Sequence, residues 1–506
     1  MHKAALTSAA AAFIAGIFFL IIAPKALPTS AAQPTTNLPP PPVRSQAGTP
    51  FAEIGALERN RKTPLEKFDR FLSSNDTTIV ARAVIALGRL GNPAGSDRLT
   101  HILADSKATD DVRAATAFAL GLLASPDSIP ALADAIARGP STVTAAAAEA
   151  LGRIGGPQAI EILAKTLGSR DASIRAAVAV GLGEAAIPGA PALDDPHRQA
   201  AARAVASAIL VERDQEVKWR MAWALDRAFY QSQAPVLRRL LTDDSELVRL
   251  FAVQGLGRLK DRSYSLPLRL ASNDRSWRVR VEAHRALSNL GDRTKVDTKP
   301  APVPKTDTVA PQPLASSAPY GDHPEVAFDT TKGFIVVELF PEQAPYSVDN
   351  FLYLVDHGFY NGLQYFRVIQ DFVIQSGDPK NGDPRSSGGP GYSIPAELNP
   401  LQQLTGIISY GLDYVNKKPV LDSAGSQYYI TESPQLHLDR AFSVFGRVVK
   451  GMAVVDAIAP HNVPLQPGDA PEPDTSRRVY RCKPVISQTA EIEAKLRTAE
   501  IGYDAR

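Results

Sequence analysis

The sequence predicts a multidomain protein, in which an all-α solenoid of helical repeats is followed by a closed antiparallel β-barrel with capping helices. Three observations favour this fold class. The chain has 506 residues, which is too long for one hydrophobic core. Residues 56–295 repeat a helical pattern, whereas residues 323–488 alternate like short strands. Two proline-rich segments, 33–55 and 296–322, are typical of extended linkers.

Composition excludes several classes of function. The hydrophobic fraction of 44% is that of a soluble globular protein, and a net charge of +2 gives no electrostatic reason to bind nucleic acid. The chain has one cysteine, Cys482, so it can form no intramolecular disulfide. With no CxxC motif and only eight scattered histidines, the chain is not expected to hold a structural zinc ion. We therefore expect no metal and no cofactor.

Residues 1–32 resemble a targeting segment. His2 and Lys3 precede an apolar block at residues 9–23, and small residues follow at 30–32. The block has the length of a signal peptide and is shorter than the roughly 20 residues of a spanning helix. We expect a cleaved signal or an uncleaved inner-membrane anchor, and hence an exported, periplasmic or cell-envelope protein; a buried helix is the remaining alternative. The charged tail, 489–506, reads as a helix whose role is not evident.

The repeats are recognised by a Val or Ile that stands eight residues before a Leu. The pairs are Ile79–Leu87, Val112–Leu120, Val143–Leu151, Ile174–Leu182, Val217–Leu225, Val248–Leu256 and Val279–Leu287. Most units are 31 residues long, and the one long step contains a proline-rich insertion at 186–196. A second apolar period follows each Leu, so each unit predicts a helix–turn–helix. Such pairs bury their apolar faces only when they stack into a solenoid.

This pattern resembles the short bacterial HEAT-like repeats, including those first named from phycobilisome lyases. The resemblance implies a solenoid that presents a surface to protein partners. Basic residues recur just after the Val or Ile of the repeat, and they either cap turns or form a binding ridge: Arg113, Arg175, Lys218, Arg249 and Arg280. A lyase-like activity is suggested by the family name alone.

The C-terminal region has a different texture. Residues 326–340 predict a β-hairpin and 344–362 an amphipathic helix with a turn. Further short strands are expected at 406–411, 427–432 and 442–449, and a last helix from Met452. Many short strands with few helices favour a closed antiparallel barrel.

One stretch, YFRVIQDFVIQSGD at 365–378, mixes apolar and polar side chains on both faces. It predicts two strands that bend at Gln370-Asp371. One set of alternating positions carries Phe366, Val368, Phe372 and Ile374, and is predicted to form a buried face. The other carries Arg367, Ile369, Val373 and Gln375, which suits neither an ordinary core nor an ordinary solvent face.

Residues 323–488 resemble the cyclophilin-type peptidyl-prolyl isomerases. The matching segments stand in order: GFIVVELFPEQAPYSVDNF at 333–351, GFYNG at 358–362, FRVIQDFVIQSGD at 366–378, AGSQYYI at 424–430 and VFGRVVKGM at 444–452. Through this resemblance Arg367 is the expected catalytic residue, beside a hydrophobic pocket for a substrate proline. The residues expected to bind substrate are Phe372, Val373, Gln375, Gly411, Leu412, Tyr429, His437, Leu438 and Phe442.

These residue types suit the implied chemistry. Rotation about an X–Pro bond crosses a barrier of about 18–20 kcal/mol and breaks no covalent bond. Twisting removes amide resonance and makes the proline nitrogen more basic. A guanidinium can donate to that nitrogen or to the adjacent carbonyl. This interaction is stronger in the twisted state than in either ground state, which is what catalysis requires.

The sequence departs from the usual family pattern around the pocket. Phe366 replaces a histidine, Val373 a methionine, Tyr429 a phenylalanine, His437 a tryptophan and Phe442 a histidine. Two hypotheses follow. The first is an exported peptidyl-prolyl isomerase that assists protein folding and acts on proline-containing polypeptide clients, with partners bound by the repeats. The alternative is a scaffold whose cyclophilin-like domain binds proline-containing segments with little or no catalysis.

Overall fold

The computed structural model describes residues 49–186, 195–228, 231–311, 323–380, 388–415, 418–458 and 479–485. The expected leader at 1–32, residues 33–48 of the expected linker and the charged tail at 489–506 lie outside the described residues. The chain divides between Asp297 and Thr298 into two compact units. Each unit is described separately below.

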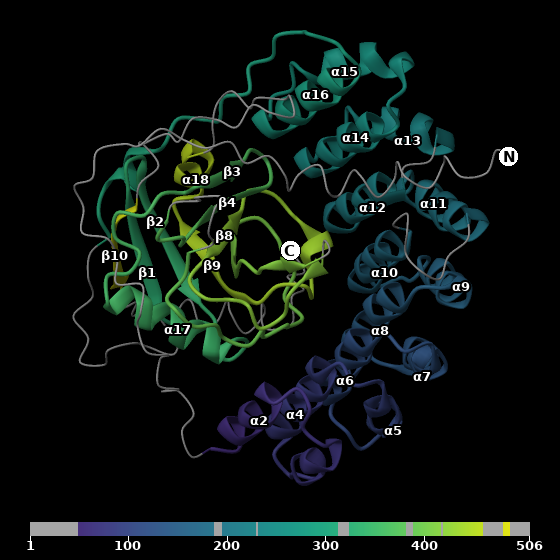
Figure 1. Ribbon diagram of the computed structural model, residues 1–506. Coiled ribbons are helices and arrows are strands. Elements are labelled where there is room, and N and C mark those ends of the chain that lie inside the picture. Colours follow the sequence, from purple (N-terminus) through teal and green to yellow (C-terminus); the bar gives the residue numbers. More distant parts are fainter. Residues whose placement is uncertain are drawn as a thin grey trace, which may run out of the picture. The chain divides into compact units, whose positions relative to one another are not determined.

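The first unit is a solenoid of helix pairs, which confirms the predicted repeats (Figure 1). Every Val/Ile–Leu pair falls on one layer of successive neighbours: α4 (Thr77–Leu90), α6 (Asp110–Leu123), α8 (Ser141–Ile154), α10 (Ala172–Ala185), α12 (Gln215–Ala228), α14 (Glu246–Arg258) and α16 (Trp277–Asn289). The second helices of the pairs form the other layer: α5 (Ser96–Ala104), α7 (Ile129–Arg138), α9 (Pro157–Thr166), α11 (Asp195–Ile209), α13 (Ala234–Leu240) and α15 (Ser265–Ala271). Two further helices, α2 (Pro50–Arg59) and α3 (Asp69–Leu72), precede them.

Small residues set the spacing of the first layer. A methyl group added at Gly88 of α4 would lie 2.8 Å from the Cα of Ala119 in α6. A methyl group at Gly152 of α8 would lie 2.3 Å from the Cα of Gly181 in α10. Both distances are well inside van der Waals contact, so the alanine- and glycine-rich pattern allows the helices to pack closely.

The recurring basic residues cap turns. Arg113 donates to the main-chain oxygen of Leu103, and Arg175 donates to that of Ser169, at 3.0 and 2.9 Å. Arg249 and Arg280 donate in the same way to the carbonyls of the turns before their own helices. Lys218 forms an ion pair of 2.5 Å with Asp243. These contacts favour the turn-capping interpretation over a basic binding ridge.

The second unit is built on an eight-stranded antiparallel sheet in the order β10-β1-β2-β9-β5-β8-β4-β3. Its strands are β1 (Glu325–Thr330), β2 (Gly333–Leu339), β3 (Arg367–Ile369), β4 (Val373–Ser376), β5 (Ile407–Tyr410), β8 (Tyr428–Thr431), β9 (Val444–Lys450) and β10 (Val479–Val485). The sheet curls into a half-barrel around a core of aromatic and aliphatic side chains (Figure 1). In the described pairings β3 and β10 are edge strands, so the barrel is less closed than the sequence predicts.

Two helices pack on this core as expected. In α17 (Pro345–Asp356) the predicted inner face of Val348, Phe351, Leu352 and Val355 is buried. The second helix, α18 (Met452–Ile458), buries Val454, Val455 and Ile458. Both helices thus complete a single hydrophobic core beneath the sheet.

The described part of the second proline-rich segment is attached to the half-barrel. Thr298 is 7% exposed and its carbonyl accepts a 3.0 Å hydrogen bond from Nε2 of Gln370. Val303 packs against the main core, and the short helix Lys305–Thr308 lies against β2. From Thr298 onward, this segment is therefore part of the second unit and not a free spacer. The domain limits predicted above stay predictions.

Candidate functional site

The sheet register places Arg367 in a row of side chains that crosses five strands. Arg367 of β3 is opposite Gln375 of β4, and Gln375 is opposite Tyr429 of β8. Tyr429 is in turn opposite Ser409 of β5, which is opposite Val444 of β9. Because directly opposite residues share one face of a sheet, this row lies on a single face.

The adjacent row points the other way, into the core. Val368, Ile374, Ile430 and Ile408 occupy the corresponding positions of β3, β4, β8 and β5, and all belong to the main hydrophobic core. The unusual parity of residues 365–378 is thereby explained. Val368 and Ile374 fill the half-barrel, and Arg367 and Gln375 stand on the opposite face.

A chain of amide groups holds the guanidinium. Nη1 of Arg367 donates to Oε1 of Gln375 at 3.0 Å, and Nε2 of Gln375 donates to Oε1 of Gln427 at 3.1 Å. Gln427 continues the chain to the main-chain oxygen of Gly388 at 3.2 Å. Gly411 approaches closely, since a methyl group there would lie 3.2 Å from Nε2 of Gln375. The chain orients Arg367 with neutral partners, which add no negative charge beside it.

An apolar cluster lies on the same face of the sheet. Val373, Tyr429 and Phe442 are buried in it, and Phe372, Leu412, Leu438 and Ala441 pack around them, partly exposed. Tyr429 and Phe442 meet edge to face, with ring centroids 5.6 Å apart. We name this set of seven residues the apolar cluster. The apolar cluster is separate from the main core and provides a hydrophobic surface next to the guanidinium.

Phe372 joins the apolar cluster because the turn before it changes the strand parity. Asp371 has a φ of 59°, a left-handed conformation that interrupts the alternation of a strand. The turn is fixed by Asp371 N–H, which donates to Glu432 at 2.5 Å, and by the hydroxyl of Ser433, which donates to the Asp371 carbonyl at 2.8 Å. The sequence pattern placed Phe372 on the buried face, and this assignment is wrong.

Phe372 connects two of the predicted site residues. The guanidinium carbon of Arg367 lies 5.6 Å from the centroid of its ring. His437, an exposed residue, stacks on the same ring at 5.9 Å and an interplanar angle of 13°. The arginine, the phenylalanine and the histidine thus form one edge of the apolar cluster.

Burial lowers the pKa of Arg367 to about 10, and the nearby hydroxyls of Tyr414 and Tyr429 partly oppose that effect. The guanidinium therefore remains charged at neutral pH. Burial raises the pKa of Tyr429 well above its usual value, so the phenol stays neutral. The site combines one cation with neutral hydrogen-bonding groups and an apolar surface.

The structure brings the predicted site residues together. Arg367, Gln375 and Gly411 meet at the amide chain, and Phe372, Val373, Leu412, Tyr429, Leu438 and Phe442 meet in the apolar cluster with His437 on its edge. Sequence reasoning missed Gln427, Ala441 and Tyr414. Gln427 stood within the matched segment AGSQYYI, so that segment could have identified it.

The comparisons agree with this geometry. A family model described as cyclophilin type peptidyl-prolyl cis-trans isomerase matches residues 325–483. A peptidyl-prolyl cis-trans isomerase-like 1 of Aspergillus niger is 38% identical over 131 residues, 26% of this chain and 78% of that protein. The protein of the same description in Neurospora crassa is 36% identical over 167 residues, 33% of this chain and 98% of that protein. The chain belongs to the cyclophilin-type peptidyl-prolyl cis-trans isomerases. It is therefore an enzyme of that class.

Two further comparisons concern the solenoid and the solved structures. A model described as HEAT repeats matches residues 105–183 and 202–288, in agreement with the solenoid. Among solved structures, a cyclophilin-type isomerase of Cryptosporidium parvum is 26% identical, with 33% of this chain and 99% of that chain covered and a TM-score of 0.26. The cyclophilin-type isomerase is thus joined to HEAT repeats in one chain.

The prediction of an exported, periplasmic or cell-envelope protein is wrong. The isomerase-like 1 proteins of the two fungi named above are among the similar proteins, and they give that location no support. In the described ranges between residues 49 and 485, no helix combines the length and apolarity needed to cross a membrane. The apolar block at residues 9–23, on which the predicted membrane tether depends, lies outside the described residues.

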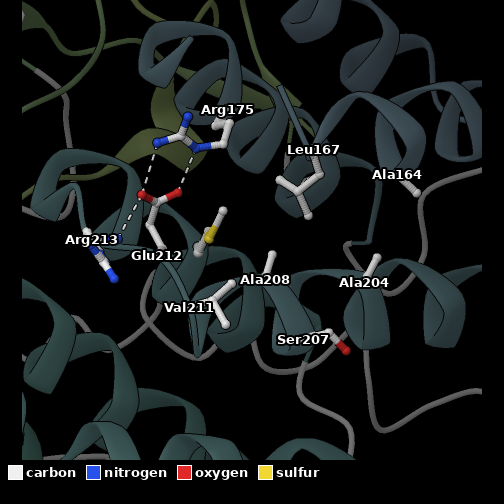
Figure 2. A pocket seen from close by; sticks show the side chains of 11 residues that line it. Ala164, Leu167, Arg175, Ala204, Ser207, Ala208, Val211, Glu212 and Arg213 are labelled. Atoms are coloured by element: carbon white, nitrogen blue, oxygen red, sulfur yellow. Dashed lines mark hydrogen bonds and ion pairs between the residues drawn. The ribbon is translucent and has the colours of Figure 1, made fainter. Parts of the chain in front are cut away.

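A concave surface also occurs in the described part of the solenoid. It has a volume of about 700 Å³ and lies among α9, α10, α11 and α12. Figure 2 shows Leu167, Ala208 and Val211 along its wall, and the guanidinium of Arg175 facing the carboxylate of Glu212 at one end. That pair is bidentate, with distances of 2.7 and 3.0 Å. Because both charges are neutralised by each other, this concavity offers packing surface and not catalytic chemistry.

Proposed function

We propose that the apolar cluster binds the proline ring of a polypeptide client and that Arg367 catalyses rotation of the bond before that proline. The observation that carries the proposal is that Arg367 shares one face of the sheet with the apolar cluster, whose buried members are Val373, Tyr429 and Phe442. Gln375 is the positioning residue, since it holds Nη1 of Arg367 from the opposite strand.

The mechanism uses only groups that this chain provides. The ring of the proline is held by apolar contacts while the acyl part of the peptide turns. In the twisted state the lone pair of the proline nitrogen is no longer delocalised into the carbonyl, and the guanidinium donates a hydrogen bond to that nitrogen or to the neighbouring carbonyl. Each tenfold gain in rate needs about 1.4 kcal/mol of preference for the twisted state. A charge-assisted hydrogen bond in a partly buried site is strong enough to supply a large part of it.

The amide chain matters because the donor must already be in place. A guanidinium that was free to rotate would lose conformational entropy on meeting the substrate. Gln375 and Gln427 fix the guanidinium in advance and leave its charge intact. Preorganised dipoles of this kind act without reorganisation at the moment of reaction.

We further propose that the activity assists protein folding and that the HEAT repeats bind clients or partner proteins. Supporting observations are the match to HEAT repeats and the apolar side chains directly after α11, where Leu210 is 41% and Val211 is 78% exposed. Exposed apolar residues beside a concave surface are typical of protein-binding sites.

The alternative is a binding module with little turnover. The observation that favours it is the altered pocket, in which Val373 offers less surface than the usual methionine and Tyr429 adds a buried hydroxyl. Membership of the isomerase family favours catalysis instead.

A refolding experiment tests the proposal. A protein whose folding is limited by a non-native prolyl bond is refolded with the full-length chain, with Arg367→Ala, and with Val211→Ser. We expect Arg367→Ala to abolish acceleration for every client, because the chemistry fails. Val211→Ser should lower acceleration of the protein client but leave short-peptide turnover unchanged. Peptide binding without turnover by the unaltered chain would establish the alternative.

A further inference from the structure

A small hairpin stands beside the guanidinium. The strands β6 (Tyr414–Val415) and β7 (Lys418–Pro419) pair antiparallel, and their turn lies outside the described residues. The base is closed by Val420 N–H, which donates to the Asp413 carbonyl at 2.8 Å. Asp413 N–H donates to the hydroxyl of Ser423 at the same distance. The chain between β5 and β8 therefore forms a defined ribbon and not an irregular loop.

This hairpin exposes large apolar side chains. Tyr414 is 39%, Val415 61% and Leu421 40% exposed, and we name these three residues the hairpin lip. In the described residues of the second unit, the other exposed large apolar side chains are Val309 and Val449. A cluster of three within eight residues is unusual for surface that binds nothing.

The hairpin lip is continuous with the substrate site. Leu412, two residues before Tyr414, packs against both the main core and the apolar cluster. Gly411 is in close approach to Gln375, as described above. Burial raises the pKa of Tyr414 and the charge of Arg367 partly opposes that effect, so the phenol lies within electrostatic range of the guanidinium. The ribbon thus begins at Gly411, beside the amide chain, and its Tyr414 lies near Arg367.

We propose that the hairpin lip binds an apolar side chain that flanks the substrate proline, and that this contact makes the enzyme select clients with apolar residues beside the proline. The inference rests on the proposed function, because it assumes that the apolar cluster binds the proline ring. It adds a specificity-determining surface to a site whose chemistry is carried by Arg367.

The geometry of an extended peptide supports this assignment. Successive residues of an extended chain advance by about 3.3 Å, so a neighbour of the proline reaches past the guanidinium within one or two residues. In the described part of the ribbon, the exposed charged side chains Asp413 and Lys418 are opposite in charge. They give no net preference for a charged neighbour, and the apolar surface decides.

The test compares turnover of short peptides that differ only beside the proline. Leucine, alanine and glutamate are placed in turn before and after it, and kcat/KM is measured with full-length protein. The variants are Val415→Ser/Leu421→Ser, Val415→Ser alone, and Val449→Ser as a matched exposed valine on β9. The unaltered protein should prefer leucine over glutamate at one of the two positions by about five-fold, the effect of partial burial of a leucine side chain.

The outcomes separate the inference from the proposed function. We expect the double variant to lose the leucine preference and to keep its rate on the alanine peptide, with Val415→Ser intermediate and Val449→Ser unchanged. A preference that survives in the double variant overturns the inference. So does an equal loss on all peptides, because the ribbon would then support the site without selecting substrate. Failure of the proposed function has a different signature, namely an Arg367→Ala variant that retains turnover on every peptide.

Discussion

Arg367 and Gln375 stand opposite each other on β3 and β4 and are joined by a hydrogen bond of 3.0 Å between Nη1 and Oε1. The amide nitrogen of Gln375 in turn donates a hydrogen bond to Gln427, so a relay of neutral groups orients the guanidinium. The first prediction concerns this relay. Gln375→Leu should lower kcat/KM about ten-fold, which is the loss of about 1.4 kcal/mol of orientation. Gln375→Glu should lower it further, because a carboxylate competes with substrate for the guanidinium.

Peptide isomerisation measured by the two variants, with far-ultraviolet circular dichroism to confirm the fold, checks that prediction. The order of the two effects is informative. If Gln375→Glu were as active as the unaltered protein, the guanidinium would not be acting on the substrate amide.

The second prediction concerns pH. Burial lowers the pKa of Arg367 to about 10, and the charged form is the active one. Activity should therefore be level from pH 7 to about 9 and fall as the pH passes the pKa of Arg367. Arg367→Lys should move the fall to lower pH, because lysine begins from a pKa of about 10.4 and burial lowers it as well. The measurement is kcat/KM against pH with the fold monitored at each point. An unchanged inflection in Arg367→Lys would argue that another group titrates.

The third prediction concerns the attached segment that begins at Thr298. The side chain of Gln370 is fully buried and donates to the Thr298 carbonyl, one residue before the left-handed Asp371. Gln370→Leu should leave that carbonyl without its donor and should lower the free energy of unfolding of the second unit by about 1–3 kcal/mol. It should also reduce kcat/KM, since the turn carries Phe372. Denaturant unfolding and peptide turnover measure both effects, and an unaltered stability would show that the segment is not fastened there.

The fourth prediction concerns the repeats. Glu184 of α10 has its pKa raised to about 7 by burial, against a partial opposing effect of Arg153. The folded state then binds a proton that the unfolded state releases above its ordinary pKa. Stability should fall as pH rises from about 4.5 to 7 and be level beyond, with a total loss of about 3 kcal/mol. Glu184→Gln should remove this slope and be the more stable form at pH 8. Thermal unfolding of both proteins from pH 5 to 8 provides the comparison, and parallel curves would contradict the raised pKa.

Much of this site follows from local sequence. The alternation in residues 365–378 predicts that Arg367, Val373 and Gln375 share a face, and the register confirms it. The Val/Ile–Leu spacing likewise predicts the first layer of solenoid helices, since a period of 3.6 residues is a local property.

Other features depend on contacts between distant residues. Phe372 changes face because Asp371 is left-handed, and that turn is held by Glu432 and Ser433, about sixty residues away in sequence. The attachment of Thr298 to Gln370 spans a similar distance. Periodicity within a short window carries no information about contacts between distant residues. The face on which Phe372 lies and the attachment of the linker therefore could not be predicted from the sequence.

The most direct test of the account is the rate at which full-length protein, Arg367→Lys and Arg367→Ala interconvert one proline-containing peptide, with binding of the same peptide measured alongside. We expect Arg367→Ala to bind the peptide through the intact apolar cluster but to lose turnover at least about a hundred-fold, corresponding to about 2.7 kcal/mol, with Arg367→Lys between the two. An Arg367→Ala protein that is folded and turns the peptide over at the unaltered rate would contradict the role of the guanidinium.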